Sequence, residues 1–158
     1  MRVGSGFDVH AFGPGDAVML GGVRVPHNRG VVAHSDGDVL LHALVDALLG
    51  AAGLGDIGQH FPDSDPRWKG ANSLDLLARA RALVADAGYE VGNLDVTVIL
   101  ERPKIGSAID DMRARVATAL AVDASRVSIK GKTNEGVDAI GRGEAIAAHA
   151  VALIRSRQ

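Results

Sequence analysis

Hydrophobic and polar residues follow two different periods along this chain, and each period predicts a different kind of element. Residues 94–100 alternate and are rich in β-branched side chains, which favours a strand, and residues 2–9 and 127–130 are two further β-prone segments. Residues 17–25 contain two short β-prone segments on either side of two adjacent glycines. Since glycine tolerates the positive φ of a tight turn, we expect a hairpin there.

Three other segments have apolar residues at the i, i+3, i+4 spacing of a helix that is buried on one face. They are residues 37–52, 73–87 and 107–121. Ser35 or Asp36 can cap the first helix, and Gly53 can end it. The apolar positions of this first helix are Leu40, Ala43, Leu44, Ala47, Leu48 and Ala51.

The segments between these elements are polar. Residues 26–33, 53–72 and 131–143 are expected to be loops, and long loops of this kind are often functional. Residues 144–154 fit both a helix and a strand, so their periodicity leaves the two alternatives open. Strands that alternate with helices predict an α/β or α+β fold in which helices pack on one sheet.

Composition narrows the class of protein further. The chain has 158 residues, of which 47% are hydrophobic, and its net charge is −2. One domain, residues 1–158, is expected. The net charge gives no electrostatic reason to expect nucleic acid or a membrane surface as a partner. There is no cysteine and no apolar run long enough for a membrane span, so we expect a cytoplasmic protein.

The first candidate for chemistry is a metal site. Asp8 and His10 are two residues apart in a predicted strand, so their side chains emerge on the same face. His42, on the first predicted helix, could be a third ligand, and three protein ligands with one open position are typical of catalytic zinc. Asp46, one helical turn further, could hold the second nitrogen of a histidine. The alternatives are a capped turn, a surface histidine and a solvated helix charge.

Two other segments are candidates for phosphate binding. His34 and Ser35 precede a helix N-terminus, where free N–H groups favour an anion, although simple capping explains Ser35 equally well. The segment 131–133 is not a P-loop, because position 126 is Arg where that motif needs glycine. Thr133 could still contact phosphate, Glu135 a hard divalent cation and Arg142 a phosphate group, unless these are ordinary surface residues.

Taken together, the motifs resemble one enzyme family. The order and spacing of these motifs along almost the whole chain are similar to those of the 2-C-methyl-D-erythritol 2,4-cyclodiphosphate synthases. The motifs are Asp8-x-His10, His34–Asp38, His42, Gly55–Gly58, Phe61–Asp65, Arg102–Lys104, Thr133–Glu135 and Gly141–Glu144. No single motif is decisive, but the set is highly specific.

The resemblance implies a fold, an assembly and a reaction. The fold would be α+β, with a mixed four-stranded sheet, three helices packed on one face, a small N-terminal hairpin, and a strand at 144–154. The assembly would be a homotrimer with active sites between subunits. The substrate would be 4-diphosphocytidyl-2-C-methyl-D-erythritol 2-phosphate. Its 2-phosphate would attack the β-phosphorus, CMP would leave, and the cyclic diphosphate of isoprenoid biosynthesis by the non-mevalonate pathway would form.

The resemblance also implies roles for individual residues. Asp8, His10 and His42 would bind Zn²⁺, Glu135 would bind a second cation, Mg²⁺ or Mn²⁺, and His34 and Thr133 would stabilise the transition state. The cytidine pocket around Pro103 and Lys104 would belong to the adjacent subunit. The substrate-binding residues would be Asp8, His10, His34, Ser35, Asp56, Gly58, Phe61, Pro62, Asp63, Ser64, Asp65, Leu100, Pro103, Lys104, Ile105, Gly106, Lys132, Thr133, Asn134, Glu135 and Arg142.

Five positions depart from the family pattern. Lys132 adds a positive charge beside the expected phosphates, and Leu100 could crowd the cytosine. Asp138 and Ala139 stand where Gly-Phe is common, so an aromatic wall is missing, and His149 replaces an acidic residue near the trimer axis.

Two alternative functions use the same residues. An Asp/His/His zinc site could activate water in a phosphate-ester hydrolase, although no further general base is evident beside the ligands. A nucleotide or isoprenoid-diphosphate sensor that has lost catalysis is the second alternative, and the complete set of candidate ligands argues against it.

Overall fold

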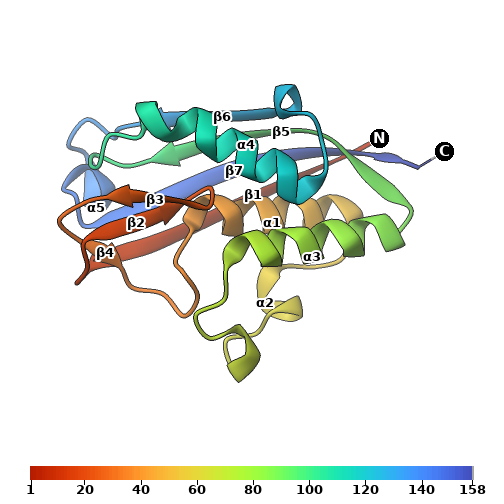
Figure 1. Cartoon of the computed structure of the whole chain (residues 1–158), viewed down its shortest axis with the longest axis horizontal. Coiled ribbons are helices and arrows are strands. Elements are labelled where there is room, and N and C mark those ends of the chain that lie inside the picture. Colours follow the sequence, from red (N-terminus) through yellow and green to blue (C-terminus); the bar gives the residue numbers. More distant parts are fainter. Residues whose placement is uncertain (158) are drawn as a thin grey trace.

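The computed structural model describes residues 1–157, and its centre is a five-stranded mixed sheet in the order β4-β1-β7-β5-β6 (Figure 1). The strands are β1 (Arg2–Gly13), β4 (Gly30–Val31), β5 (Tyr89–Ile99), β6 (Val127–Lys132) and β7 (Ala145–Ser156). Only β5 and β6 are parallel, because the chain crosses over between them through a helix. Strands β2 (Ala17–Leu20) and β3 (Val23–Pro26) form a separate hairpin, as predicted.

The prediction of a four-stranded sheet was wrong by one strand. β1 continues to Gly13, and its last residues pair with β4, so that Phe12 lies opposite Val31. This added strand lies inside the segment 26–33, which we expected to be a loop. A two-residue strand is too short to show a period in the sequence, and its pairing with β1 defines it.

Residues 145–156 form a strand, which resolves the ambiguity of the C-terminal segment. β7 lies between β1 and β5 and pairs antiparallel with both. Its small residues are buried on both sides of the strand, as at Ala147 and Ala148. Because a central strand is paired and packed on both sides, alanine is accommodated there despite its preference for helices.

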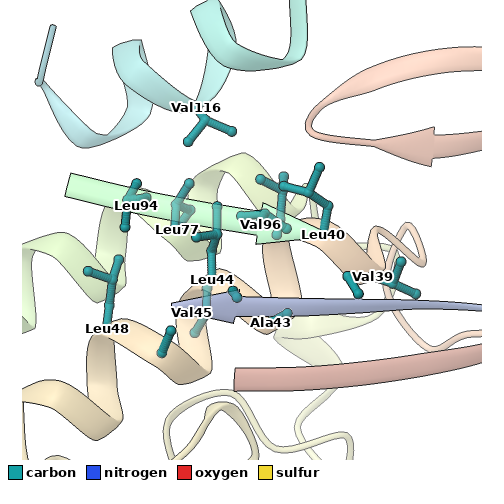
Figure 2. Packing of buried hydrophobic residues seen from close by; sticks show 14 of the residues in the cluster. Val39, Leu40, Ala43, Leu44, Val45, Leu48, Leu77, Leu94, Val96 and Val116 are labelled. Atoms are coloured by element: carbon teal, nitrogen blue, oxygen red, sulfur yellow. The ribbon is translucent and has the colours of Figure 1, made fainter. Parts of the chain in front are cut away.

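Three long helices pack on one face of the sheet: α1 (Val39–Ala52), α3 (Ser73–Asp86) and α4 (Ile109–Leu120). Helix α1 is buried on nearly all sides, because β1, β7 and α3 surround it. Figure 2 shows how Leu44 and Leu48 of α1, Leu77 of α3, Leu94 and Val96 of β5 and Val116 of α4 point into one core. No helix in residues 1–157 is long and apolar enough to cross a membrane.

The first helix begins later than predicted. Its N-cap is Asp38, whose Oδ1 accepts a hydrogen bond from Leu41 N at 3.1 Å, so neither Ser35 nor Asp36 caps it. Asp38 is fully buried and also accepts hydrogen bonds from the N–H groups of Gly21 and Gly22 in the hairpin turn. This one carboxylate therefore joins the hairpin to the start of α1. Gly53 ends the helix in the left-handed conformation, as predicted.

The expected loops 53–72 and 131–143 contain short helices. α2 (Ile57–His60) and the 3-10 turn η1 (Pro66–Trp68) lie in the first, and α5 (Asp138–Gly141) lies in the second. Each of the first two begins at an aspartate, Asp56 or Asp65, whose side chain accepts a backbone N–H two or three residues later. One-turn helices lack the repeated apolar spacing that identified the long ones.

The opposite face of the sheet is bare. The odd-numbered residues of β1 point away from the helices, and Phe7 and Val9 are 57% and 48% exposed. Val151, on the neighbouring strand β7, is exposed on the same face. Exposed apolar residues gathered on one sheet face are typical of a surface that another chain covers.

Candidate active site

The strand and the helix that carry the candidate ligands lie unusually close together. Gly4 and Gly6 stand on the side of β1 that faces α1. A Cβ atom at either position would lie 2.0 Å from a carbonyl oxygen of α1, that of Ala47 or Ala43. Only glycine permits this approach. Asp8 and His10 continue the same face of β1, and His42 begins the part of α1 that packs there.

The three candidate ligands converge on one point. Asp8 Oδ2 lies 3.0 Å from His10 Nε2 and 3.0 Å from His42 Nδ1, and the two imidazole nitrogens are 3.3 Å apart. Tetrahedral zinc with bonds of about 2.0–2.1 Å places its ligand atoms about 3.3 Å from one another. The three donors therefore fit one zinc ion, and they are the group within residues 1–157 that has this ligand geometry.

Electrostatics at the triad favour a bound cation. Burial alone would raise the pKa of Asp8, but hydrogen bonds from His10 and His42 outweigh burial and lower this pKa to about 2. Burial would lower the pKa of His42, but the hydrogen bond and the charge of Asp8 raise it. At neutral pH the carboxylate is thus ionised, and a metal ion would take the place of the proton that it shares with the imidazoles.

The second nitrogen of His42 is held by serines. His42 Nε2 lies 3.0 Å from Ser35 Oγ and 2.9 Å from Ser73 Oγ. Ser73 is fully buried, and it donates its own hydroxyl hydrogen to Asp36 Oδ1. A partner of this kind fixes the tautomer and the ring orientation of a metal-binding histidine. Asp36 therefore holds Ser73, and Ser73 holds His42.

Of the two alternatives for Asp46, a hydrogen bond to a histidine nitrogen is not found among residues 1–157. Asp46 Oδ1 accepts a hydrogen bond from Ile57 N at 2.7 Å, so this carboxylate fixes the start of α2 instead. Its pKa is raised, mainly by burial. Sequence reasoning missed Ser73, because it lies 31 residues from His42 and nothing local connects the two.

A cavity of about 320 Å³ opens at the triad. Six other predicted substrate-binding residues line it: His34, Ser35, Gly58, Phe61, Pro62 and Asp63. Sequence reasoning missed Trp68 and Leu76, which form part of its apolar wall. His34 Nε2 and Trp68 Nε1 are buried and have no hydrogen-bond partner among residues 1–157. This wall therefore has hydrogen-bonding capacity that the protein itself leaves unused.

Three predicted contacts near this cavity do not line it. The Asp56 side chain caps α2 through Gln59 N, and the Asp65 side chain caps η1. Asp65 also pairs with Arg67, whose hydrogen bonds lower the pKa of Asp65. Ser64 is exposed beside them. In this conformation the two aspartates order the 56–68 loop, and a role of all three in substrate binding stays a prediction.

A second cavity, also of about 320 Å³, contains the predicted cytidine residues. It is lined by Leu100, Glu101, Pro103, Lys104, Ile105, Gly106, Ile109, Gly131, Lys132 and Thr133. Leu100 is almost fully buried, so it forms part of the wall. Two lysines at an otherwise mainly apolar pocket suit a ligand that has both a ring and phosphates.

Asn134, Glu135 and Arg142 line neither cavity. Asn134 N donates to Glu101 Oε1 at 2.8 Å, and the Asn134 side chain bonds Asp138. Glu135 is exposed and has a left-handed backbone, with φ of 51°. Arg142 pairs with Glu144 at 2.9 Å. The cation and diphosphate roles expected for these residues therefore stay predictions.

The two cavities are far apart within one chain. Val9, Ala147, Ile99 and Lys132 lie side by side on four successive strands, so the triad and the second cavity are three strand spacings apart. Three spacings amount to about 14 Å. The β2–β3 hairpin also contacts both α1 and α4, and it lies between the two regions (Figure 1). Within one chain the hairpin therefore separates the two cavities.

Comparison with known proteins gives one consistent result. The model of the YgbB family matches residues 1–155. The 2-C-methyl-D-erythritol 2,4-cyclodiphosphate synthase of Pseudomonas aeruginosa strain UCBPP-PA14 is 57% identical over 157 residues, which cover 99% of this chain and 100% of that protein.

Two solved structures share the fold. The bifunctional IspDF of Campylobacter jejuni has a TM-score of 0.96 and 41% identity, and the match covers 99% of this chain but 42% of the longer one. A complex of Plasmodium falciparum IspF with CDP has a TM-score of 0.87 and 38% identity, and the match covers 99% of this chain and 97% of the other.

Proposed function

The chain belongs to the YgbB family, the 2-C-methyl-D-erythritol 2,4-cyclodiphosphate synthases, and from this premise we propose how its residues close the ring. The substrate is 4-diphosphocytidyl-2-C-methyl-D-erythritol 2-phosphate. An oxygen of the 2-phosphate forms a new bond to the β-phosphorus, and the bond from that phosphorus to the oxygen of the α-phosphate breaks. CMP carries away this electron pair, and no base is needed because the nucleophile is already anionic.

The observation that carries this proposal is the convergence of Asp8, His10 and His42 at the mouth of a cavity. Their spacing fits zinc, and the cavity leaves a direction from which a phosphate oxygen could approach. Divalent cations bound there and at Glu135 would neutralise the diphosphate and polarise the phosphorus under attack.

Other residues of the protein then have to hold the substrate in a bent conformation, in which its two phosphate groups lie close together. His34 and Ser35 lie beside the triad, where they can bind the methylerythritol phosphate part. Phe61 and Trp68 form an apolar wall that excludes water, which would otherwise compete as the nucleophile. Holding both ends of one molecule replaces a chance encounter of its two phosphates by a high effective concentration.

The other half of the site comes from a second copy of the chain. Lys104, Lys132 and Thr133 are separated from the triad of their own chain by about three strand spacings and by the hairpin. In a neighbouring copy they could face the same substrate from the opposite side. Thr133 and His34 would then stabilise charge on the phosphorus as its bonds change, and Glu135 would hold the second cation.

The bare face of the sheet supports this assembly. Phe7, Val9 and Val151 are exposed together there, and a homotrimer would bury them. His149 lies opposite Phe7 on the same face and would be enclosed with them.

Product analysis tests the reaction. The protein is incubated with the cytidine substrate, Zn²⁺ and Mg²⁺, and the products are followed by phosphorus NMR. CMP and the cyclic diphosphate are expected in equal amounts. Linear phosphate products would instead identify a zinc hydrolase, and binding of CDP without release of CMP would identify a sensor.

A further inference from the structure

A groove of about 490 Å³ lies at the end of the molecule opposite the cytidine pocket. It is formed by the C-terminal ends of α3 and α4 and the first residues of β5. Strand β5 runs from this groove, at Tyr89, to the cytidine pocket, which follows Ile99. Eleven strand residues span roughly 35 Å, so the two sites are separate. In Figure 1 this end carries both termini, and α5 lies at the other end.

Three arginines line the groove: Arg81, Arg126 and Arg157. None of them pairs with a carboxylate of residues 1–157, which is also true of five arginines elsewhere, but these three line one groove. We call this site the arginine groove. Guanidinium groups without a carboxylate partner are the usual ligands of phosphate groups in proteins.

The other charges at the groove do not neutralise the arginines. Glu90 is already paired with Arg155 at Nε, and Asp86 is the one remaining carboxylate of the lining. The helix C-termini add about half a negative charge each. Against the three guanidinium groups, Asp86 and the two helix ends leave about one excess positive charge in the lining. Asp123 lies just outside it, where hydrogen bonds of its own turn and the charge of Arg126 lower its pKa.

The floor of the groove is apolar. Val84, Val91 and Leu120 line it, and the Tyr89 ring stands at its side. These residues belong to the helix side of the sheet, so the groove stays open when the bare face is covered. A cavity of this size with a polar rim and an apolar floor suits a small molecule that has an anionic group and an organic body.

We propose that the arginine groove binds a small organic phosphate at a site separate from the catalytic one. The phosphate group lies among Arg81, Arg126 and Arg157, and the organic part rests on the apolar floor. Backbone bonds support this arrangement, because Arg157 N donates to Gly88 O at 2.9 Å and thereby fixes the C-terminal segment beside the groove.

Titration by NMR tests the proposal. The catalytic site is first saturated with CDP, Zn²⁺ and Mg²⁺, and phenyl phosphate is then added at constant ionic strength. Backbone amide signals of residues 81–91, 120–126 and 155–157 are expected to shift. Phenyl phosphate should bind about fivefold more tightly than inorganic phosphate, because only the former covers the apolar floor. Equal affinities, or shifts spread over every basic surface, would overturn the proposal.

Variants assign the effect to particular residues. Arg126→Gln and Arg157→Gln should each weaken binding about tenfold, since each removes a charge-assisted hydrogen bond. Arg126→Lys should fall between Arg126→Gln and the wild type, because lysine keeps the charge but loses the planar fork. Arg115→Gln, at an exposed arginine of α4 outside the groove, is the matched control. Unchanged affinity in both glutamine variants, with unchanged melting temperatures, would refute the site.

Discussion

The metal cavity and the cytidine cavity have the same size but are built differently. The triad stands on β1 and α1, two core elements that touch through glycines, and its side chains already hold one another. The cytidine cavity is formed mainly by the segments that follow β5 and by the end of β6, and Lys104 and Lys132 have no ion-pair partner among residues 1–157. The metal site is therefore preorganised within one chain, whereas no ion pair among residues 1–157 holds the two lysines of the cytidine cavity.

This difference predicts where a substitution acts. A change in the triad should remove the chemistry, because no other group can replace a ligand of the metal. A change in the cytidine cavity should weaken binding, and a neighbouring copy could supply the missing half only where that copy has an intact cavity, as in a mixed assembly.

The largest effect is expected for His42→Ala. The variant lacks one of three ligands, so zinc should be lost, and with it the several kcal/mol by which a bound cation stabilises the transition state. We expect kcat to fall about a thousandfold or more. Metal analysis and phosphorus NMR measure the two losses. His27→Ala, at a histidine outside both cavities, is the control and should behave as the wild type. A His42→Ala protein that is fully active and contains zinc would disprove the ligand assignment.

The second prediction tests whether the two halves come from different copies. Asp8→Ala and the double variant Thr133→Ala/Glu135→Ala should each be inactive in their own assemblies. When they are unfolded together and refolded as a mixture, a site with both halves intact should form at about one interface in four. Activity should rise to about a quarter of the wild-type value. A mixture that stays as inactive as its components would show that each chain builds its own site.

The sequence predicted most of the framework. Period-two segments gave the strands, the helical spacing gave α1, α3 and α4, and the two glycines gave the hairpin turn. These signals are local, because each depends on residues within about ten positions of one another. Asp8 and His10 were placed on one face for the same reason, and the structure confirms that their side chains lie together.

The remaining features depend on contacts between distant segments. The short strand β4 exists because it pairs with the end of β1, and Asp38 caps α1 because the hairpin turn supplies two further donors. Ser73 reaches His42 only after α3 has packed beside α1. Gly4 and Gly6 did carry a signal, since alternate glycines on one strand face mark a close approach of another backbone.

The third prediction concerns Ser73, which is not a ligand of the metal but holds the ligand His42 by a hydrogen bond. Ser73→Ala leaves all three ligands in place but removes a hydrogen-bond partner of His42 Nε2. Zinc affinity should fall about 10- to 100-fold, with a smaller loss of kcat at saturating zinc. Competition with a zinc chelator measures the affinity. Ser125→Ala, at an exposed serine, is the control. Unchanged affinity would mean that Ser35 alone fixes the imidazole.

The smallest effect concerns the stability of the metal-free protein in acid. Asp8 has a pKa of about 2 in the folded state against an ordinary value of 3.8. A lowered carboxyl pKa stabilises the folded state above pH 3.8, and this contribution disappears as the pH falls through 2. The shift corresponds to at most about 2.5 kcal/mol, and partial exposure to solvent reduces this to about 1–2 kcal/mol.

The difference in the free energy of unfolding between the wild type and Asp8→Asn should therefore shrink by about two thirds of this amount between pH 5 and pH 2.5, because the folded-state pKa is about 2. Urea titration at each pH measures it. Asp16, which pairs with Arg24 on the surface, provides the control variant, Asp16→Asn. Equal dependence for both variants would mean that the triad is no more preorganised than a surface ion pair. The preorganisation that distinguishes the metal cavity from the cytidine cavity would then have no energetic basis.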